Sequence, residues 1–404
     1  MAIDNKDKKV LNVPHLRFPE FTEEWERTTV GNIGNIKNGP FGSVLHAEDY
    51  VEDGIPIVTT EHFKTGLMPS DKFGIPQVSN EDYIRLKGFR LETNDIVFSR
   101  VGSVDINAHV GIEQNGWLFS GRVLRVRPKQ TVDSLFLHYA LSTEAVKRDI
   151  CNRAVGQTMP SINTPILSST IIRLPKGIFE QKKVAHFLRL LDERITTQNK
   201  IIEDLKKLKS AIIEMEYTYK TKGNTHIGDF IEQTSKRNKD SAIQNVLSVS
   251  NSQGFIQQCE QFENRSVASD DISNYKIVER NCFAFNPARI NVGSIARLTT
   301  FDRGIVSPMY ICFRTKDNLF PEYLDYYFES KQFFTEIQKR LEGSVRQCLS
   351  YEGLCNIPLC IPTVEVQQQT GKRLSTLAQE IKLEIDFLEL LQKQKKFLLH
   401  QMFI

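Results

Sequence analysis

Arginine and asparagine side chains that directly follow short β-type segments are the residues best suited to bind a ligand. Arg100 follows the run Ile96 to Ser99, within the segment Phe98 to Ser103. The matching place in the second half carries Asn286, Arg289 and Asn291. Arginine pairs bidentately with guanine and asparagine with adenine, so these residue types suit the reading of base edges in DNA. The alternative reading is that they belong to structural turns.

Three glycine-containing loops extend this candidate DNA-binding set. The segment Gly39 to Ser43 is turn-forming, and its glycines allow close backbone approach. Gly156 to Asn163 is a polar loop before a predicted strand, and Gly343 to Cys348 is its counterpart. The two counterparts differ in sequence, as readers of different half-sites would. The candidate residues are Gly39, Phe41, Gly42, Ser43, Arg100, Gly102, Ser103, Gln157, Thr158, Ser161, Asn163, Asn286, Arg289, Asn291, Ser294, Ser344, Arg346 and Gln347.

Motifs for catalysis are missing from the sequence. It contains no G-x-x-x-x-G-K-[ST] phosphate loop and no G-x-G-x-x-G. Asn286-Pro287 shares only the first two residues of the Asn-Pro-Pro-aromatic motif of DNA amino-methyltransferases, and no nuclease pattern is present. The eight histidines show no metal spacing and the seven cysteines form no C-x-x-C pair. We therefore predict a protein that is not an enzyme, with reduced thiols and no metal or cofactor of its own.

Length and composition indicate a globular protein of two or three domains. The chain has 404 residues, of which 40 % are hydrophobic and 25 % charged, and a formal net charge of +3. No apolar run approaches the roughly 18 residues of a membrane span, and the N-terminus lacks the apolar core of a signal peptide. These features predict a cytoplasmic protein without a membrane partner.

An internal repeat at an offset of 187 residues organises the chain. Asn94 to Phe98 aligns with Asn281 to Phe285, and Phe119 to Arg127 aligns with Val306 to Arg314. The same offset places Pro175, Gln181, Lys209 and Met215 on Pro362, Gln368, Lys396 and Met402. Val101 to Val104 matches Val292 to Ile295 only after a local shift of four residues. We interpret the chain as a duplication.

Each half repeats one plan. Short β-type runs are expected at 96–99, 123–126, 171–174 and 310–313. One amphipathic helical stretch follows in each half, at Ser134 to Ile150 and at Pro321 to Leu341, and a long helix closes the half.

The two long helices carry coiled-coil patterns. From Phe179 to about Tyr219 there is no Gly or Pro, and from about Glu365 to Phe403 only Gly371 interrupts the pattern. Steps of four and three residues define a mostly apolar seam in each helix. Its members are Val184, Leu188, Leu191, Ile195, Gln198, Ile202, Leu205, Lys209 and Ile212 in the first helix, and Leu374, Leu377, Ile381, Glu384, Leu388, Leu391, Lys395, Leu398 and Met402 in the second. The four polar members either set the register or mark solvated ends.

The predicted fold class is therefore mixed α/β. Two similar globular domains, residues 1–178 and 220–364, are separated by two long antiparallel helices, residues 179–219 and 365–404, that pair as a coiled coil with approximate two-fold internal symmetry. At about 1.5 Å per residue each helix extends roughly 60 Å. Such spaced domains suit either a DNA sequence read in two parts or a scaffold for two protein partners.

The order of several motifs resembles the specificity (S) subunits of type I restriction–modification systems. The opening Pro14-His15-Leu16-Arg17-Phe18-Pro19-Glu20-Phe21 with Trp25, the segments 39–43, 94–103 and 156–163, and Phe179 to Val184 follow the family pattern, and so does the closing Lys395 to Phe403. The likeness spans nearly the whole chain. The second half departs from the pattern: it has Gln367-Gln368 where Glu-Gln is expected, and no clear Gly-Pro-Phe-Gly loop.

This resemblance implies two target-recognition domains that each read one part of a bipartite, asymmetric site in double-stranded DNA. It also implies that the helices act as a ruler and dock two methyltransferase (M) subunits, and that restriction (R) subunits join the complex. S-adenosylmethionine, ATP and magnesium are then expected on those partners.

Two other hypotheses remain at this point. A coiled-coil adaptor would hold two protein partners and bind no nucleic acid. A stand-alone DNA methyltransferase would need motifs that the sequence lacks.

Overall fold

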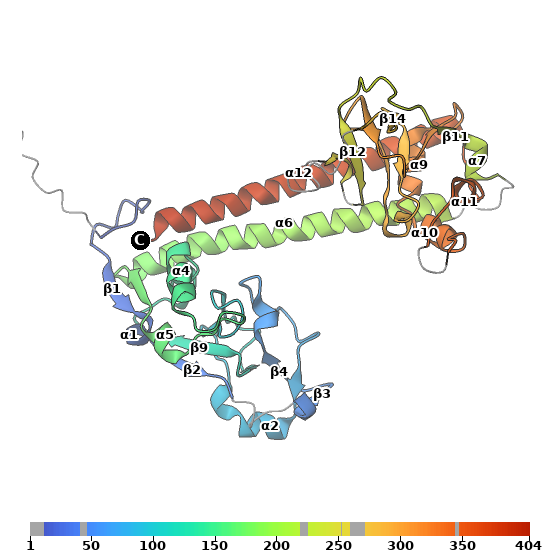
Figure 1. Ribbon diagram of the computed structural model, residues 1–404. Coiled ribbons are helices and arrows are strands. Elements are labelled where there is room, and N and C mark those ends of the chain that lie inside the picture. Colours follow the sequence, from blue (N-terminus) through green and yellow to red (C-terminus); the bar gives the residue numbers. More distant parts are fainter. Residues whose placement is uncertain (1–11, 41–46, 219–224, 252, 259–270, 344–346) are drawn as a thin grey trace, which may run out of the picture. The chain divides into compact units, whose positions relative to one another are not determined.

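The computed structural model describes residues 12–40, 47–218, 225–251, 253–258, 271–343 and 347–404 (Figure 1). The chain divides into two compact units. Unit 1 comprises residues 1–197 and 388–404, and unit 2 comprises residues 198–387. In the described part of the chain, no helix is both long and apolar enough to cross a membrane.

Unit 1 contains two four-stranded sheets and one two-stranded sheet. Their strand orders are β2-β9-β6-β7, β3-β5-β4-β8 and β1-β10. The strands are β1 (Glu26–Thr29), β2 (Gly34–Asn38), β3 (Tyr50–Val51), β4 (Ile55–Val58), β5 (Gln77–Val78), β6 (Ile96–Ser99), β7 (Asn107–His109), β8 (Leu118–Phe119), β9 (Val123–Pro128) and β10 (Ile171–Leu174). The helices are α1 (Val30–Ile33), η1 (Ala47–Asp49), η2 (Thr60–Phe63), α2 (Asn80–Arg85), η3 (Lys87–Phe89), α3 (Ser134–Leu141), α4 (Glu144–Arg153), α5 (Thr164–Ser168) and the start of α6 (Ile178–Thr218).

Alternate residues of the central strands of unit 1 enter two different cores. Ile96 and Phe98 of β6 pack in the core that also contains Phe136 of α3 and Leu188 of α6. Val97, between them, packs with residues of the second sheet, including Val58. This alternation is the period of two expected of a strand covered on both faces, so the sheet lies between a helical layer and a second sheet.

Unit 2 repeats these layers with different side chains. Its sheets have the orders β11-β18-β15-β16 and β13-β12-β17-β14. Phe283 and Phe285 enter the helix-side core, and Ala284 between them enters the core against the second sheet. The strands are β11 (Ile231–Thr234), β12 (Val246–Ser250), β13 (Gly254–Gln257), β14 (Lys276–Glu279), β15 (Phe283–Phe285), β16 (Ile295–Arg297), β17 (Arg303–Val306) and β18 (Ile311–Thr315). The helices are α7 (Ile227–Phe230), η4 (Ile290–Val292), α9 (Pro321–Tyr327), α10 (Lys331–Gln338), α11 (Tyr351–Cys355) and α12 (Val364–Met402).

The strand registers confirm the internal repeat. Ile96 of β6 lies opposite Val126 of β9, and Phe283 of β15 lies opposite Phe313 of β18, each partner shifted by 187 residues. The four-residue shift that aligns Val101 to Val104 with Val292 to Ile295 in sequence is not seen in the strand pairing. The Ser99 N–H donates to Ile106 O and the Asn286 N–H donates to Ser294 O, so Ser294 occupies the place of Ile106 rather than that of Ser103.

Each predicted amphipathic stretch is two helices rather than one. In unit 1 the chain breaks between α3 and α4, where the Ser142 and Thr143 hydroxyls donate to the carbonyls of His138 and Ala140. In unit 2 the Ser330 hydroxyl caps α10 by accepting from the Phe333 N–H. Hydroxyl side chains that bond nearby backbone favour helix ends over helix interiors, which the apolar spacing alone did not reveal.

The two long helices pair antiparallel, as predicted. In unit 2, Gln198 of α6 donates to Glu384 O of α12, and Glu216, further along α6, accepts from Thr370, earlier in α12. In unit 1, Val184 and Leu188 pack in one core with Leu398 and Met402. None of the predicted seam residues is exposed, so the seam is the buried stripe of each helix. The predicted end of the first helix, Tyr219, lies outside the described residues.

The polar seam residues are paired rather than solvated. Gln198 is buried and its amide also donates to the Glu384 carboxylate. Lys395 pairs with Asp192 and lies 5.8 Å from the Tyr139 ring centroid. Unit 2 contains a corresponding arrangement, in which Lys209 pairs with Glu329 and lies 5.1 Å from the Tyr326 ring centroid.

A buried glutamine anchors the start of each long helix. The Gln181 side-chain Oε1 accepts from the Asp133 N–H, and its Nε2 donates to Pro175 O. In unit 2 the same bonds are made by Gln367, to the Phe320 N–H and to Pro362 O. The expected equivalence of Gln181 with Gln368 is therefore wrong by one residue, because α12 begins one residue early relative to the sheet register.

Candidate nucleic-acid interface

Several predicted segments meet at one end of the sheet β2-β9-β6-β7. The Arg100 N–H, just after β6, donates to Arg122 O, just before β9, at 3.0 Å. The Ile162 N–H then donates to Arg100 O at 2.9 Å. The end of β2 joins them, because the Gly39 N–H donates to Val123 O at 3.1 Å. Segments far apart in sequence are therefore tied together by backbone hydrogen bonds.

Gly39 is required by close approach rather than by unusual backbone angles. A Cβ at this position would lie 1.9 Å from Ser120 O. Any side chain would push the β2 end away from the turn before β9. The following predicted residues, Phe41, Gly42 and Ser43, lie outside the described residues.

The loop after α4 is a closed turn held against the end of β6. Val155 and Ser161 exchange two backbone hydrogen bonds, of 2.9 and 2.8 Å, and Gly156 between them has a φ of +104°. The Gly102 N–H donates to Pro160 O at 2.8 Å. Gln157 and Thr158 at the loop tip are exposed, as is Ser103 on the neighbouring segment. This geometry presents polar side chains on a fixed backbone.

Three predicted residues of this surface also form side-chain hydrogen bonds within the fold. The Ser161 hydroxyl donates to Val155 O at 3.2 Å. Arg100 is half-buried and donates from Nη1 to Gly121 O at 3.0 Å, so it braces the turn before β9. Asn163 caps α5 by accepting from the Ile166 N–H at 3.0 Å. Their role as DNA contacts stays a prediction.

Two residues of this surface were missed from the sequence. Arg122 is exposed beside Arg100, and Met159 is exposed at the tip of the loop after α4. Burial raises the pKa of the Tyr50 phenol, and the nearby Arg122 charge acts in the opposite direction. Arg122 lies within the repeated segment Phe119 to Arg127, directly before the predicted strand 123–126. An arginine at the start of a predicted strand was the sequence signal that could have identified it.

Unit 2 builds the same loop-on-strand geometry. The Leu349 N–H donates to Pro287 O at 3.0 Å, at positions equivalent to Ile162 and Arg100. Glu342 and Cys348 exchange two hydrogen bonds of 2.9 Å each, and Gly343 has a φ of +100°. Pro287 stands where unit 1 has Arg100, so this unit lacks an arginine at that position. Ser344 and Arg346 lie outside the described residues, and Gln347 is exposed.

The predicted residues after β15 divide into two groups. Asn286 and Ser294 are buried: the Asn286 side chain accepts from the Ala288 N–H, and the Ser294 hydroxyl donates to Val249 O. Arg289 is exposed and Asn291 is half-buried. The first two support the loop from inside, while Arg289 faces solvent.

No metal-binding cluster of three or more His, Cys, Asp or Glu side chains occurs among the described residues. The candidate site is a polar surface built on strand ends in each unit.

Comparisons with known proteins agree with this architecture. Residues 22–207 match the family model described as type I restriction modification DNA specificity domain. The chain is 23 % identical to the MjaVIII type I restriction enzyme specificity subunit of Methanocaldococcus jannaschii, over 97 % of this chain and 94 % of that protein. It is 28 % identical to a putative type I specificity subunit of Mycoplasma pneumoniae, over 48 % of this chain and 45 % of that protein.

A solved structure shares the fold over nearly the full length. The type I restriction–modification S subunit from M. genitalium matches with a TM-score of 0.61 at 15 % identity, covering 97 % of this chain and 99 % of that one. A structure described as showing complex assembly and conformational transition of the type I system matches with a TM-score of 0.54 at 12 % identity, covering 93 % and 96 %. The chain is therefore similar in sequence to type I restriction–modification specificity subunits and shares their fold over nearly its full length.

Proposed function

We propose that this chain directs a type I restriction–modification complex to its DNA target. Each unit reads one half of a bipartite, asymmetric site in double-stranded DNA, through the loops at the strand ends. The observation that carries the proposal is the repeated loop-on-strand geometry, with Ile162 bonded to Arg100 in unit 1 and Leu349 bonded to Pro287 in unit 2. The two surfaces have the same backbone hydrogen-bond pattern but different side chains, as expected of two domains that read different DNA sequences.

The chain itself is proposed to be non-catalytic. Two methyltransferase subunits and the restriction subunits would supply the chemistry and would bind S-adenosylmethionine, ATP and magnesium. Exposed apolar side chains on the long helices support a docking role for these helices. In unit 2, Ile201, Leu208 and Met215 are exposed at seven-residue steps along α6, and in unit 1 Leu390 and Phe397 are exposed at the same step along α12. Apolar side chains repeated along one helix face favour contact with partner helices.

The test is co-expression with an adenine methyltransferase subunit, followed by mapping of methylated adenines. Replacing residues 4–178 by the corresponding part of another family member should change one half of the methylated motif and leave the other. Arg100→Ala should weaken recognition of one half-site, by about 1–3 kcal/mol if the side chain makes a bidentate base contact. A motif that does not respond to the domain replacement would refute the proposal.

Two further measurements address the ruler and the adaptor alternative. Seven residues inserted after Leu205, matched by seven in the facing part of α12, keep the seam in phase and add about 10 Å. The unread spacer should lengthen; an unchanged spacer would exclude a ruler. DNA affinity of the complex should fall steeply with salt because phosphate contacts release counterions, whereas an adaptor without nucleic acid would show no DNA binding at all.

A further inference from the structure

A basic cavity in unit 1 is lined by residues that are not among the predicted DNA-binding residues. Its volume is about 600 Å³, and it is lined by residues of β2 and β9 and by the segment 87–92. Five lining side chains are cationic: Lys37, Lys87, Arg90, Arg125 and Arg127. Arg125 and Arg127 alternate with core residues along β9, so both face away from the helix-side core.

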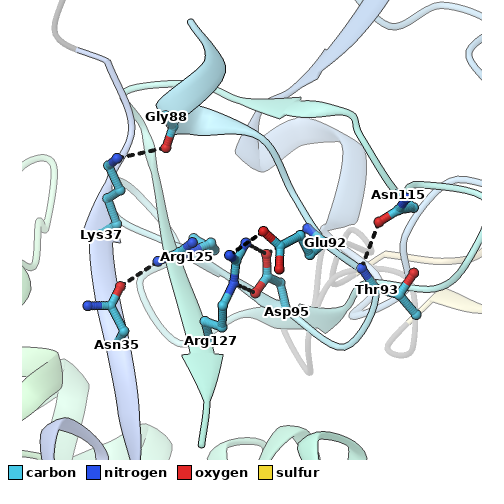
Figure 2. A network of polar contacts seen from close by, with 9 residues as sticks. All are labelled: Asn35, Lys37, Gly88, Glu92, Thr93, Asp95, Asn115, Arg125 and Arg127. Carbon is cyan, nitrogen blue, oxygen red and sulfur yellow. Dashed lines mark hydrogen bonds and ion pairs between the residues drawn. The ribbon is translucent and has the colours of Figure 1, made fainter.

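The charge of Arg127 is balanced by ion pairs with the two nearby carboxylates, those of Asp95 and Glu92. Its guanidinium lies 2.7 and 2.8 Å from the two Asp95 carboxylate oxygens and also pairs with Glu92 (Figure 2). A fork-to-fork pair of this kind uses both carboxylate oxygens. Asp95 and Glu92 are therefore committed to one of the five cations.

Arg125 is buried without a carboxylate of its own. The residue is 6 % exposed, and its Nη2 donates to Asn35 Oδ1 at 2.5 Å (Figure 2). Its Nε is buried and has no hydrogen-bond partner among the described residues. Burial lowers the pKa of Arg125, which reflects the cost of placing this charge away from water. An unsatisfied donor on a buried cation is expensive unless something fills the site.

Two further cations at the cavity are held by neutral groups. Lys37 Nζ donates to Gly88 O at 2.7 Å and lies 4.9 Å from the Phe89 ring centroid. Arg90 stacks 3.7 Å above the Tyr83 ring, and its Nε is also buried without a partner among the described residues. Aromatic rings and carbonyl oxygens orient these cations but cancel little of their charge.

The second repeat shows that the topology does not require a cation at this position. Arg125 lies opposite Val97, and its equivalent Cys312 lies opposite Ala284. Cys312 is buried in an apolar core with Val249. Replacing buried charges by apolar residues is often neutral or stabilising, so the fold alone gives no reason to retain Arg125.

We propose that this cavity binds a phosphate group, with Arg125 and Arg90 donating to its oxygens and Lys37 and Lys87 supplying further positive charge. Guanidinium forks match the spacing of phosphate oxygens, and a dianion suits a site with several uncompensated cations. The phosphate belongs either to a DNA backbone or to a free phosphorylated ligand. The inference does not rest on the proposed function, because phosphate binding is measurable without DNA.

The test is a titration of the full chain with pyrophosphate at constant ionic strength, in which the phosphorus NMR signal of pyrophosphate measures binding. The wild-type chain should bind saturably. Arg125→Met should weaken binding at least about tenfold, because charged hydrogen bonds are lost. Lys87→Ala should weaken it about two- to fivefold, as expected for an exposed charge. Lys129→Ala, an exposed cation outside the cavity, is the matched control and should bind like the wild type.

Lys87 is exposed, so its variant tests the site even if Arg125→Met does not fold. Absence of saturable binding, or unchanged affinity in Lys87→Ala, would overturn the proposal. A duplex added to the complex with the methyltransferase partner distinguishes the two sources of phosphate. Displacement of pyrophosphate assigns the site to the DNA backbone, and retention assigns it to a free ligand. Failure of the proposed function would show separately, in the methylation map.

Discussion

The Asp192 carboxylate of α6 lies 2.5 Å from the Lys395 ammonium of α12 inside unit 1. The same carboxylate accepts from the Tyr139 hydroxyl of α3 at 2.8 Å. Burial raises the pKa of Tyr139, and the Asp192 charge raises it further, so the phenol stays protonated and keeps donating. One carboxylate therefore links the two long helices to the helical layer of the α/β region.

We predict that Asp192 and Lys395 are energetically coupled. A double-mutant cycle with Asp192→Asn and Lys395→Met should give a coupling of about 1 kcal/mol in the free energy of unfolding, because the pair is shielded from solvent on most sides. Urea denaturation of the full chain measures it. The exposed pair Glu389–Lys393 on α12 is the control and should couple by less than about 0.5 kcal/mol. Equal coupling in both pairs would contradict a role for Lys395 in setting the seam.

Glu180 holds the N-terminal segment against α6, and we expect it to be critical for stability. Its oxygens accept from Arg17 at 2.7 and 2.8 Å and from the Trp25 indole at 3.0 Å, and Glu180 is buried. Glu180→Gln leaves the Arg17 charge without its partner and should cost about 2–4 kcal/mol. Thermal and urea unfolding check this. Glu193→Gln, in an exposed pair on the same helix, should cost under about 0.5 kcal/mol; a similar loss in both variants would argue against the clamp.

The two buried glutamines provide a matched pair within one chain. Gln181→Ala leaves a backbone N–H and one carbonyl without their partner, and Gln367→Ala leaves a backbone N–H and two carbonyls, of Pro362 and Asn318. Each substitution should destabilise by about 1–3 kcal/mol. Gln368→Ala changes an exposed neighbour and should be nearly neutral. Unfolding free energies of the three variants decide the register. A loss in Gln368→Ala instead of Gln367→Ala would support the sequence alignment over the structure.

Gln181 and Gln367 show which features of the fold apolar spacing predicts and which depend on hydrogen bonds. The period of the seam and the offset of 187 residues arise from apolar spacing, which the cores enforce, so both long helices and the duplication were predictable. A one-residue slip at Gln367 leaves the spacing of α12 intact, and only the hydrogen bonds to Phe320 and Pro362 reveal it. Helix breaks at Ser142 and Ser330 depend on hydroxyl bonds in the same way.

The sequence predicted which loops form the candidate surface, but not what each side chain in them does. Loop composition marked the segments around Arg100 and Gly156, and hydrogen bonds do bring them together. Sequence could not tell that Asn163 caps a helix or that Asn286 points inward, because both depend on partners set by tertiary structure. Nor could it place Arg90 and Arg125, 35 residues apart, around one cavity.

Arg122 is expected to contact DNA without supporting the fold. It is exposed at the meeting point of the candidate loops, so Arg122→Ala should leave the melting temperature within about 1 °C of the wild-type value. Binding of the methyltransferase complex to DNA should weaken by about 1–3 kcal/mol if Arg122 reads a base. A mobility-shift assay with matched and single-substituted duplexes measures the change. Arg148→Ala on α4, an exposed arginine elsewhere, is the control; equal effects of the two substitutions would mean a general charge effect.

The buried histidine of α3 predicts acid sensitivity of unit 1. His138 Nδ1 lies 2.7 Å from Asn107 Oδ1, and the Asn107 amide donates to Ser142, so Nδ1 carries the proton of a neutral ring. Burial lowers the pKa of His138 to about 3, and the charges of His109, Lys395 and Lys147 act in the same direction.

A depressed folded-state pKa means that the unfolded chain binds the proton more readily. The stability that neutral His138 contributes is therefore present above about pH 6.5 and is lost as the pH falls toward 3. Between pH 7 and pH 5 the loss should be about 2 kcal/mol. Hydrogen exchange of a peptide covering α3 should report it, and His138→Gln should flatten the dependence. In unit 2 the equivalent residue is Asp325, whose pKa is raised by burial, so its contribution is lost as pH rises instead. If α9 showed the same acid-induced opening as α3, and His138→Gln left the α3 profile unchanged, the effect would not arise from this histidine.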